Sequence, residues 1–262
     1  MAASAYFSFL FAAYLAAFII YFVHFETRSD ISLQLGRKAI LGGLALHLLA
    51  LAAPFFQCKM IVQAIHPEFA IPFFMLLAAL LIEIKNRASF LMLFTLPIAL
   101  VFLVAALGHD SQTQKMLAER GFWLWFHLAF VFIGMAVLAV AVSSAAMFLI
   151  QRRQITSHRP GKFFMGLPSL DTLERIHTRA LIAGVVFFSV GLLSGLFWAG
   201  NTNSLGLFGK DPKVILSIAA CALYWGMLGL RLSSFGRGRK IALGTLGAFV
   251  LLFLAAVYPH GL

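Results

Sequence analysis

Long runs of apolar residues alternate with short polar segments along the whole chain. Each run approaches the ~20 residues that a helix needs to cross a bilayer, and a backbone in lipid satisfies its own hydrogen bonds by being helical. The pattern predicts an all-α polytopic membrane helix bundle with eight transmembrane helices, built as one integral membrane domain over 1–262. The predicted spans are about 3–23, 39–56, 69–84, 88–107, 121–150, 180–200, 214–231 and 241–258.

Composition agrees with a membrane chain. The protein is 62% hydrophobic and 11% charged, whereas soluble domains are about 45–50% apolar and about 25% charged. The two cysteines, Cys58 and Cys221, form no CxxC pair, so we expect neither a disulfide framework nor a zinc site.

The net charge of +11 is distributed unevenly over the predicted loops. Of the 20 Lys and Arg residues, 15 fall on one set of alternating loops and 5 on the other. Cytoplasmic loops of membrane proteins carry such an excess, so the distribution predicts cytoplasmic basic loops and both termini on the external side. We therefore interpret the charge as an orientation signal and expect no nucleic-acid partner.

The longest predicted cytoplasmic segment, 151–179, is basic and partly apolar. It is either a linker held at the membrane surface by anionic lipid or a docking site for a cytoplasmic partner. Within it, Pro168 followed by Asp171 and Glu174 is typical of a helix start with a capping box.

No predicted span carries a charged residue near its middle. Glu83 lies at the cytoplasmic end of the third span, where we expect it to reach water. Because proton-coupled pumps and ion carriers usually need an embedded charge, and no internal repeat is evident, a small-molecule transporter is the weakest functional hypothesis.

Histidine is the exception to this absence of residues that can carry a charge. His47 lies about 13 Å into the second span at ~1.5 Å per residue, where it is either a structural hydrogen-bonding group or an iron ligand or proton relay. His177 is expected at the interfacial start of the sixth span. The histidines expected to be solvated are His24, His66, His109 and His158.

Two further histidines are predicted at the external interface. His127 follows Trp123 and Trp125 at the start of the fifth span, and His260 follows the eighth span. Each alone is explained as an interfacial polar residue. Together they suggest a shared site, since neutral imidazole is a common axial ligand of haem iron.

The external loop between the sixth and seventh spans lies on the same predicted side. It begins at Trp198 and ends in Asp211-Pro212-Lys213. Asp at an N-cap with Pro at the first helical position also explains this end of the loop as a plain helix start.

Several of these segments resemble the cytochrome c assembly family, the haem-handling group that includes CcsA, CcmC and HemX-like proteins. The segments are Gly195-Leu-Phe-Trp198-Ala, the loop ending in Asp211-Pro212-Lys213, and Arg237-Gly-Arg239-Lys240. The run from Leu167 to Arg175 is similar to the HemX and YpjD-like branch. The resemblance covers most of the chain and is strongest over 120–262.

The resemblance implies a haem site. In the family a tryptophan-rich external segment cradles haem and flanking histidines ligate its iron. It therefore implies His127 and His260 as iron ligands, Trp198 and Asp211 as haem-binding residues, and His47 as the counterpart of a membrane-embedded histidine. The family pattern W-G-x-x-W-x-W-D is reduced here to Trp198, and the second embedded histidine falls near 228–229, where no histidine stands.

The leading hypothesis is a haem-handling protein of the bacterial inner membrane that supports cytochrome c assembly. It would bind haem b at its outer face without catalysing a reaction itself, and work with lipid and other cytochrome c biogenesis proteins. The alternative is a HemX-like regulatory or scaffold protein that binds no haem and docks a cytoplasmic partner at 151–179.

Overall fold

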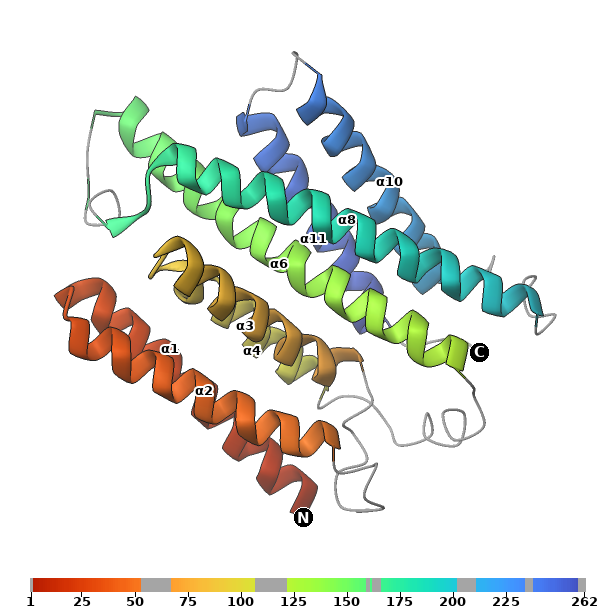
Figure 1. Cartoon of the computed structure of the whole chain (residues 1–262), viewed down its shortest axis with the longest axis horizontal. Helices are drawn as coiled ribbons and strands as arrows, with labels where there is room; N and C mark the ends of the chain where they lie inside the picture. The colour runs from red at the N-terminus through yellow and green to blue at the C-terminus, as the bar shows by residue number, and fades with distance from the viewer. Residues whose placement is uncertain are drawn as a thin grey trace. The chain divides into compact units, whose positions relative to one another are not determined.

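The computed structural model describes residues 2–52, 67–106, 122–158, 161, 166–201, 211–233 and 238–258. In these residues every regular element is a helix, and one helix matches each predicted span (Figure 1). The helices are α1 (Ala2–Thr27), α2 (Asp30–Ala52), α3 (Pro67–Asn86), α4 (Leu91–Ala106), α6 (Phe122–Thr156), α8 (Leu170–Asn201), α10 (Pro212–Leu232) and α11 (Gly238–Val257).

Seven of these helices are long and apolar enough to cross a membrane. The shorter apolar helix is α4, whose 16 residues extend about 24 Å at ~1.5 Å per residue; residues 107–121, which follow it, lie outside the described part of the chain. The prediction of an all-helical, polytopic membrane protein is confirmed.

Several helices begin earlier or end later than the apolar runs. Helix α2 begins at Asp30 rather than near 39, and α8 begins at Leu170 rather than near 180. Helix α6 continues to Thr156, beyond the predicted 150. Hydropathy marks only the apolar part of a helix, whereas Gln, Glu, Lys and Arg are good helix formers that continue it into the polar region.

The helix start that we predicted after Pro168 is confirmed, since α8 begins at Leu170, but a different residue caps it. The hydroxyl of Ser169 accepts a hydrogen bond from the backbone N–H of Thr172 at 3.3 Å. Asp171 lies inside the first turn, where its carboxylate pairs with Arg175. Ser169, with Thr172 three residues later, therefore caps the helix, a role that we had predicted for Asp171 with Glu174.

The helices fall into two compact units, 1–111 with 151–168 and 112–150 with 169–262. In the first unit α1 packs on α2 and α4, and α3 packs on α4 and α2. In the second unit α10 packs on α11 and α8. The single domain over 1–262 stays a prediction.

Within each unit the basic turns lie at one end. In the first unit, the guanidinium of Arg28, after α1, lies 4.8 Å from the ring centre of Phe90, before α4. In the second unit, Glu174 near the start of α8 pairs with Arg231 near the end of α10. Each unit therefore has the arrangement that alternating basic loops require.

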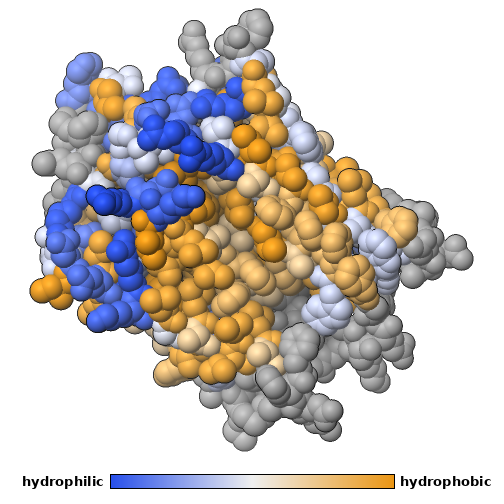
Figure 2. Space-filling view, viewed as in Figure 1, coloured by the Kyte–Doolittle hydropathy of each residue, from blue (hydrophilic) through white to orange (hydrophobic). Residues whose placement is uncertain are grey.

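Apolar side chains cover much of the visible face of the protein, and hydrophilic side chains gather apart from them (Figure 2). Large exposed apolar residues occur on the membrane-crossing helices of both units, including Phe9, Ile31, Leu49, Leu193 and Val250. Exposed apolar area of this extent is typical of a surface that contacts lipid.

The expectation that Glu83 reaches water is wrong. Its side chain is 0% exposed, and one carboxylate oxygen accepts hydrogen bonds from Arg37 Nε at 3.0 Å and from the Tyr21 hydroxyl at 3.1 Å. Position along α3 places Glu83 near the helix end, but the face on which it lies turns inward against α1 and α2.

Candidate functional site

His127 projects from the first turns of α6 onto α8 within the second unit. Its Nδ1 lies 2.7 Å from the carbonyl oxygen of Gly191. Because a carbonyl only accepts, Nδ1 carries the proton and the imidazole lone pair lies on Nε2. Histidines that ligate metals usually show this pattern, with one nitrogen donating to a backbone carbonyl and the other directed to the metal.

Glycines on α8 make room for this histidine. A Cβ atom at Gly195 would lie 2.7 Å from both Nδ1 and Cε1 of the His127 ring, so the ring occupies the space of the missing side chain. The hydroxyl of Ser194 also donates to the Gly191 carbonyl, at 2.7 Å. The spacing Gly191-x-x-x-Gly195 is a known signal for close approach of membrane helices, and it is the signal that our sequence reasoning missed.

Aromatic side chains surround the same end of α6 and α8. The rings of Trp123 and Phe197 lie 5.1 Å apart, and those of Phe126 and Phe130 lie 4.5 Å apart. Trp198 follows Phe197 and is half-buried. These residues give the neighbourhood of His127 the apolar, aromatic character of small-molecule and cofactor sites.

The start of α10 and the end of α11 lie at the corresponding end of the second unit. Lys213 Nζ donates to the carbonyl oxygen of Ala256 at 3.4 Å. Helices α8 and α10 are antiparallel. Arg231 near the end of α10 pairs with Glu174 near the start of α8, whereas Trp225, earlier in α10, donates to Ser189, later in α8. The start of α10 therefore lies toward the end of α8 that carries Trp198. His260 lies outside the described residues, shortly after Tyr258.

Asp211 is the N-cap of α10, as predicted. Its side chain accepts a hydrogen bond from the backbone N–H of Lys213 at 2.8 Å, and Pro212 occupies the first helical position. The buried carboxylate thus has a structural role at the same end of the unit as His127 and Trp198.

Substitutions at Asp211 test its capping role. We expect Asp211→Ala to lower the free energy of unfolding by about 1 kcal/mol, because the first turn of α10 loses an acceptor. Asp211→Asn keeps a side-chain acceptor and should unfold like the wild type in thermal melts. Equal destabilisation by both substitutions would contradict the capping role.

His47 belongs to a different hydrogen-bonded group, in the first unit. Its side chain is fully buried, Nδ1 lies 3.0 Å from the Tyr14 hydroxyl, and Nε2 lies 2.9 Å from the carbonyl oxygen of Phe69. Nε2 is therefore the donor and Nδ1 accepts from the tyrosine, so both nitrogens join α2 to neighbouring helices. In this arrangement His47 serves as the inter-helix hydrogen-bonding group that was one of its two predicted roles.

Two other histidines are buried. His24 is buried rather than solvated, with Nδ1 2.9 Å from the carbonyl oxygen of Ser29 and its ring stacked on Phe90. His177 is also buried, and its Nε2 lies 3.0 Å from the hydroxyl oxygen of Thr245 on α11. His158 is exposed, as predicted, whereas His66 and His109 lie outside the described residues.

Comparison with protein families gives one match that spans nearly the whole chain. The model of the family described as cytochrome C assembly protein matches residues 2–258. The match includes α1 to α11 and therefore both the His47 and the His127 neighbourhoods.

Curated relatives are similar over part of their length. The cytochrome c biogenesis protein CcsA of Prochlorococcus marinus (strain MIT 9301) is 27% identical over 202 residues, covering 68% of this chain and 65% of the relative. CcsA of Welwitschia mirabilis is 25% identical over 207 residues, with coverage of 68% and 65%. An uncharacterized 28.8 kDa protein of Azospirillum brasilense is 30% identical over 139 residues, with coverage of 53% and 50%. The chain thus spans between half and about two thirds of these relatives, and no solved structure matches it significantly.

Proposed function

The chain belongs to the cytochrome c assembly protein family, and from this premise we propose that it binds haem and delivers it for cytochrome c assembly. This proposal rests on the hydrogen bond from His127 Nδ1 to the Gly191 carbonyl at 2.7 Å. This bond favours the imidazole tautomer whose Nε2 lone pair would ligate iron. The similarity to proteins named for cytochrome c biogenesis supports this role.

The residues around His127 suit the chemistry of haem. Haem is a flat apolar ring that needs aromatic walls, axial nitrogen ligands and polar or basic groups for its propionates. In this proposal His127 would be one iron ligand, Trp123 and Trp198 would contribute walls, and Lys213 would pair with a propionate. His260, which follows α11 in the sequence, is proposed as a second residue that would ligate the iron.

We further assign the protein a binding and delivery role without catalysis of its own. The ligand is proposed to be haem b, held at the external face of the bacterial inner membrane. This orientation follows from the 15 to 5 distribution of Lys and Arg over alternating loops. Other cytochrome c biogenesis proteins would receive or supply the haem.

A His127→Asn variant tests the iron ligand separately from the structural hydrogen bond. The Asn carboxamide can replace Nδ1 as donor to the Gly191 carbonyl but offers nothing in place of Nε2. We expect the purified variant to retain wild-type unfolding but to lose haem by at least about tenfold, measured as Soret absorbance per protein from a haem-replete host. His158→Asn, at an exposed histidine, is the matched control and should keep its haem.

Two further measurements sharpen this test. Adding imidazole to a His127→Gly variant should restore the Soret band, because the free ligand replaces the lost ring. His260→Ala should change a six-coordinate spectrum to a five-coordinate one. Full haem content in His127→Asn would overturn the site assignment, and wild-type protein without haem would favour the HemX-like regulatory role.

A further inference from the structure

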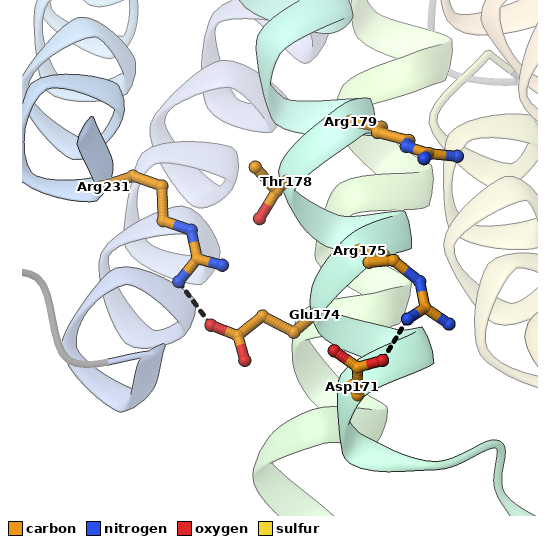
Figure 3. A pocket seen from close by; sticks show the side chains of 6 residues that line it. All are labelled: Asp171, Glu174, Arg175, Thr178, Arg179 and Arg231. Atoms are coloured by element: carbon orange, nitrogen blue, oxygen red, sulfur yellow. Dashed lines mark hydrogen bonds and ion pairs between the residues drawn. The ribbon is translucent and has the colours of Figure 1, made fainter.

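We propose that the start of α8 and the end of α10 form a binding site for the phosphate of an acidic phospholipid. A surface pocket of about 250 Å³ lies there, within the second unit and at the end remote from His127 (Figure 3). Its lining residues are Asp171, Glu174, Arg175, Thr178, Arg179 and Arg231. This inference does not depend on haem binding.

One of the three arginines in the pocket is available to bind an anion, because the other two pair with carboxylates. Three arginines and two carboxylates line it, and both carboxylates are already bound: Asp171 pairs with Arg175, and Glu174 pairs with Arg231 (Figure 3). Arg179 makes no ion pair with any residue that the structure describes. The lining therefore carries a net positive charge centred on Arg179, whose guanidinium suits phosphate oxygens.

Thr178 provides an independent sign of a missing partner. Its Oγ1 is buried and has no hydrogen-bond partner within the described chain. Helical threonines normally donate to the carbonyl four residues earlier, as Thr27, Thr95, Thr156 and Thr245 do in this protein. A buried hydroxyl without a partner is destabilising, whereas a phosphate oxygen in the pocket would satisfy it.

The surroundings of the pocket favour a lipid as the source of the phosphate. The pocket lies at the polar ends of two helices that are long and apolar enough to cross the membrane. Ile182, one turn beyond Thr178, is 40% exposed, and Leu230, next to Arg231, is 43% exposed. A headgroup phosphate at Arg179 would thus leave its acyl chains beside exposed apolar side chains, on the side that carries the basic loops.

The test measures lipid retention by the purified full-length protein. Native mass spectrometry would compare bound phosphatidylglycerol with bound phosphatidylcholine, with inorganic phosphate as a competitor in a separate arm. Thr178→Val keeps the shape of the side chain and removes the hydroxyl. Arg179→Gln removes the charge, and Arg239→Gln removes an exposed charge from α11 outside the pocket as the matched control.

We expect phosphatidylglycerol to bind about fivefold more weakly to Thr178→Val and Arg179→Gln, with no change in Arg239→Gln. Thr178→Val should also unfold at the same temperature as the wild type or higher, which separates lost binding from misfolding. Equal phosphatidylglycerol retention by all three variants would overturn the site. Displacement of the lipid by low millimolar inorganic phosphate would overturn the assignment to a lipid.

Discussion

Replacing Arg37 by Met should lower the free energy of unfolding by about 3 kcal/mol, more than replacing Glu83 by Gln. The two residues form an ion pair at 3.0 Å in which the Glu83 side chain is 0% exposed and that of Arg37 is 30% exposed. Without the guanidinium, a fully buried carboxylate keeps the hydrogen bond from Tyr21 but loses its charge partner. Removing one partner of a buried pair is costly because the other is left uncompensated.

Substitution of the other partner, Glu83, should lower the free energy of unfolding by less. In Glu83→Gln the amide oxygen still accepts from Tyr21, and the long side chain of Arg37 can either keep its hydrogen bond to this oxygen or turn its charged end toward water. Arg153→Met, at an exposed arginine of α6, controls for the loss of a basic residue. Unfolding by SDS titration in mixed micelles, followed by helical circular dichroism, gives the three values. A larger loss in Glu83→Gln than in Arg37→Met would contradict this account of the pair.

The number and order of the helices could be predicted because lipid imposes one simple rule. Every apolar run has to be a helix, and each predicted run corresponds to a described helix. The helix ends were less predictable, as at Asp30 and Leu170, because helical residues continue past the apolar region into the headgroup level.

The faces of the helices could not be predicted from the sequence alone. Glu83 was expected to reach water and His24 to be solvated, but both are buried. In a membrane helix both inward and outward faces are apolar, so the pattern that marks a buried face in a soluble protein is weak. The regular spacing of Tyr14 and Tyr21 along α1, both fully buried, was the available signal for its inner face.

The candidate site was predicted in part. His127, Trp198 and Asp211 do lie at corresponding ends of helices in the second unit, because antiparallel helices bring alternate loops together. The acceptor for His127 could not be predicted, because it is the backbone carbonyl of Gly191. Every residue type has a backbone carbonyl, so the sequence does not indicate which one accepts. The two glycines spaced four apart were the indirect sign of it.

The close approach of α6 and α8 predicts a second large loss of stability, for a substitution at Gly134. A Cβ atom at this position would lie 2.6 Å from the backbone nitrogen of Phe188 and 2.7 Å from its Cα. Backbone atoms cannot turn aside as a flexible side chain does, so α6 and α8 would have to separate. Contacts of the same kind recur along the pair, since a Cβ at Gly191 would lie 2.8 Å from the backbone nitrogen of Val131.

We therefore expect Gly134→Ala to lower the free energy of unfolding by about 3 kcal/mol, at the upper end of the usual range for overpacking. Gly247→Ala in α11 is the matched control, because no atom lies within 4 Å of its added Cβ and alanine favours the helix by up to about 1 kcal/mol. The same SDS titration measures both. Separation of α6 from α8 would also lengthen the hydrogen bond from His127 to Gly191, so Gly134→Ala should lose haem together with stability. A Gly134→Ala protein as stable as Gly247→Ala would show that the two helices do not pack through this glycine.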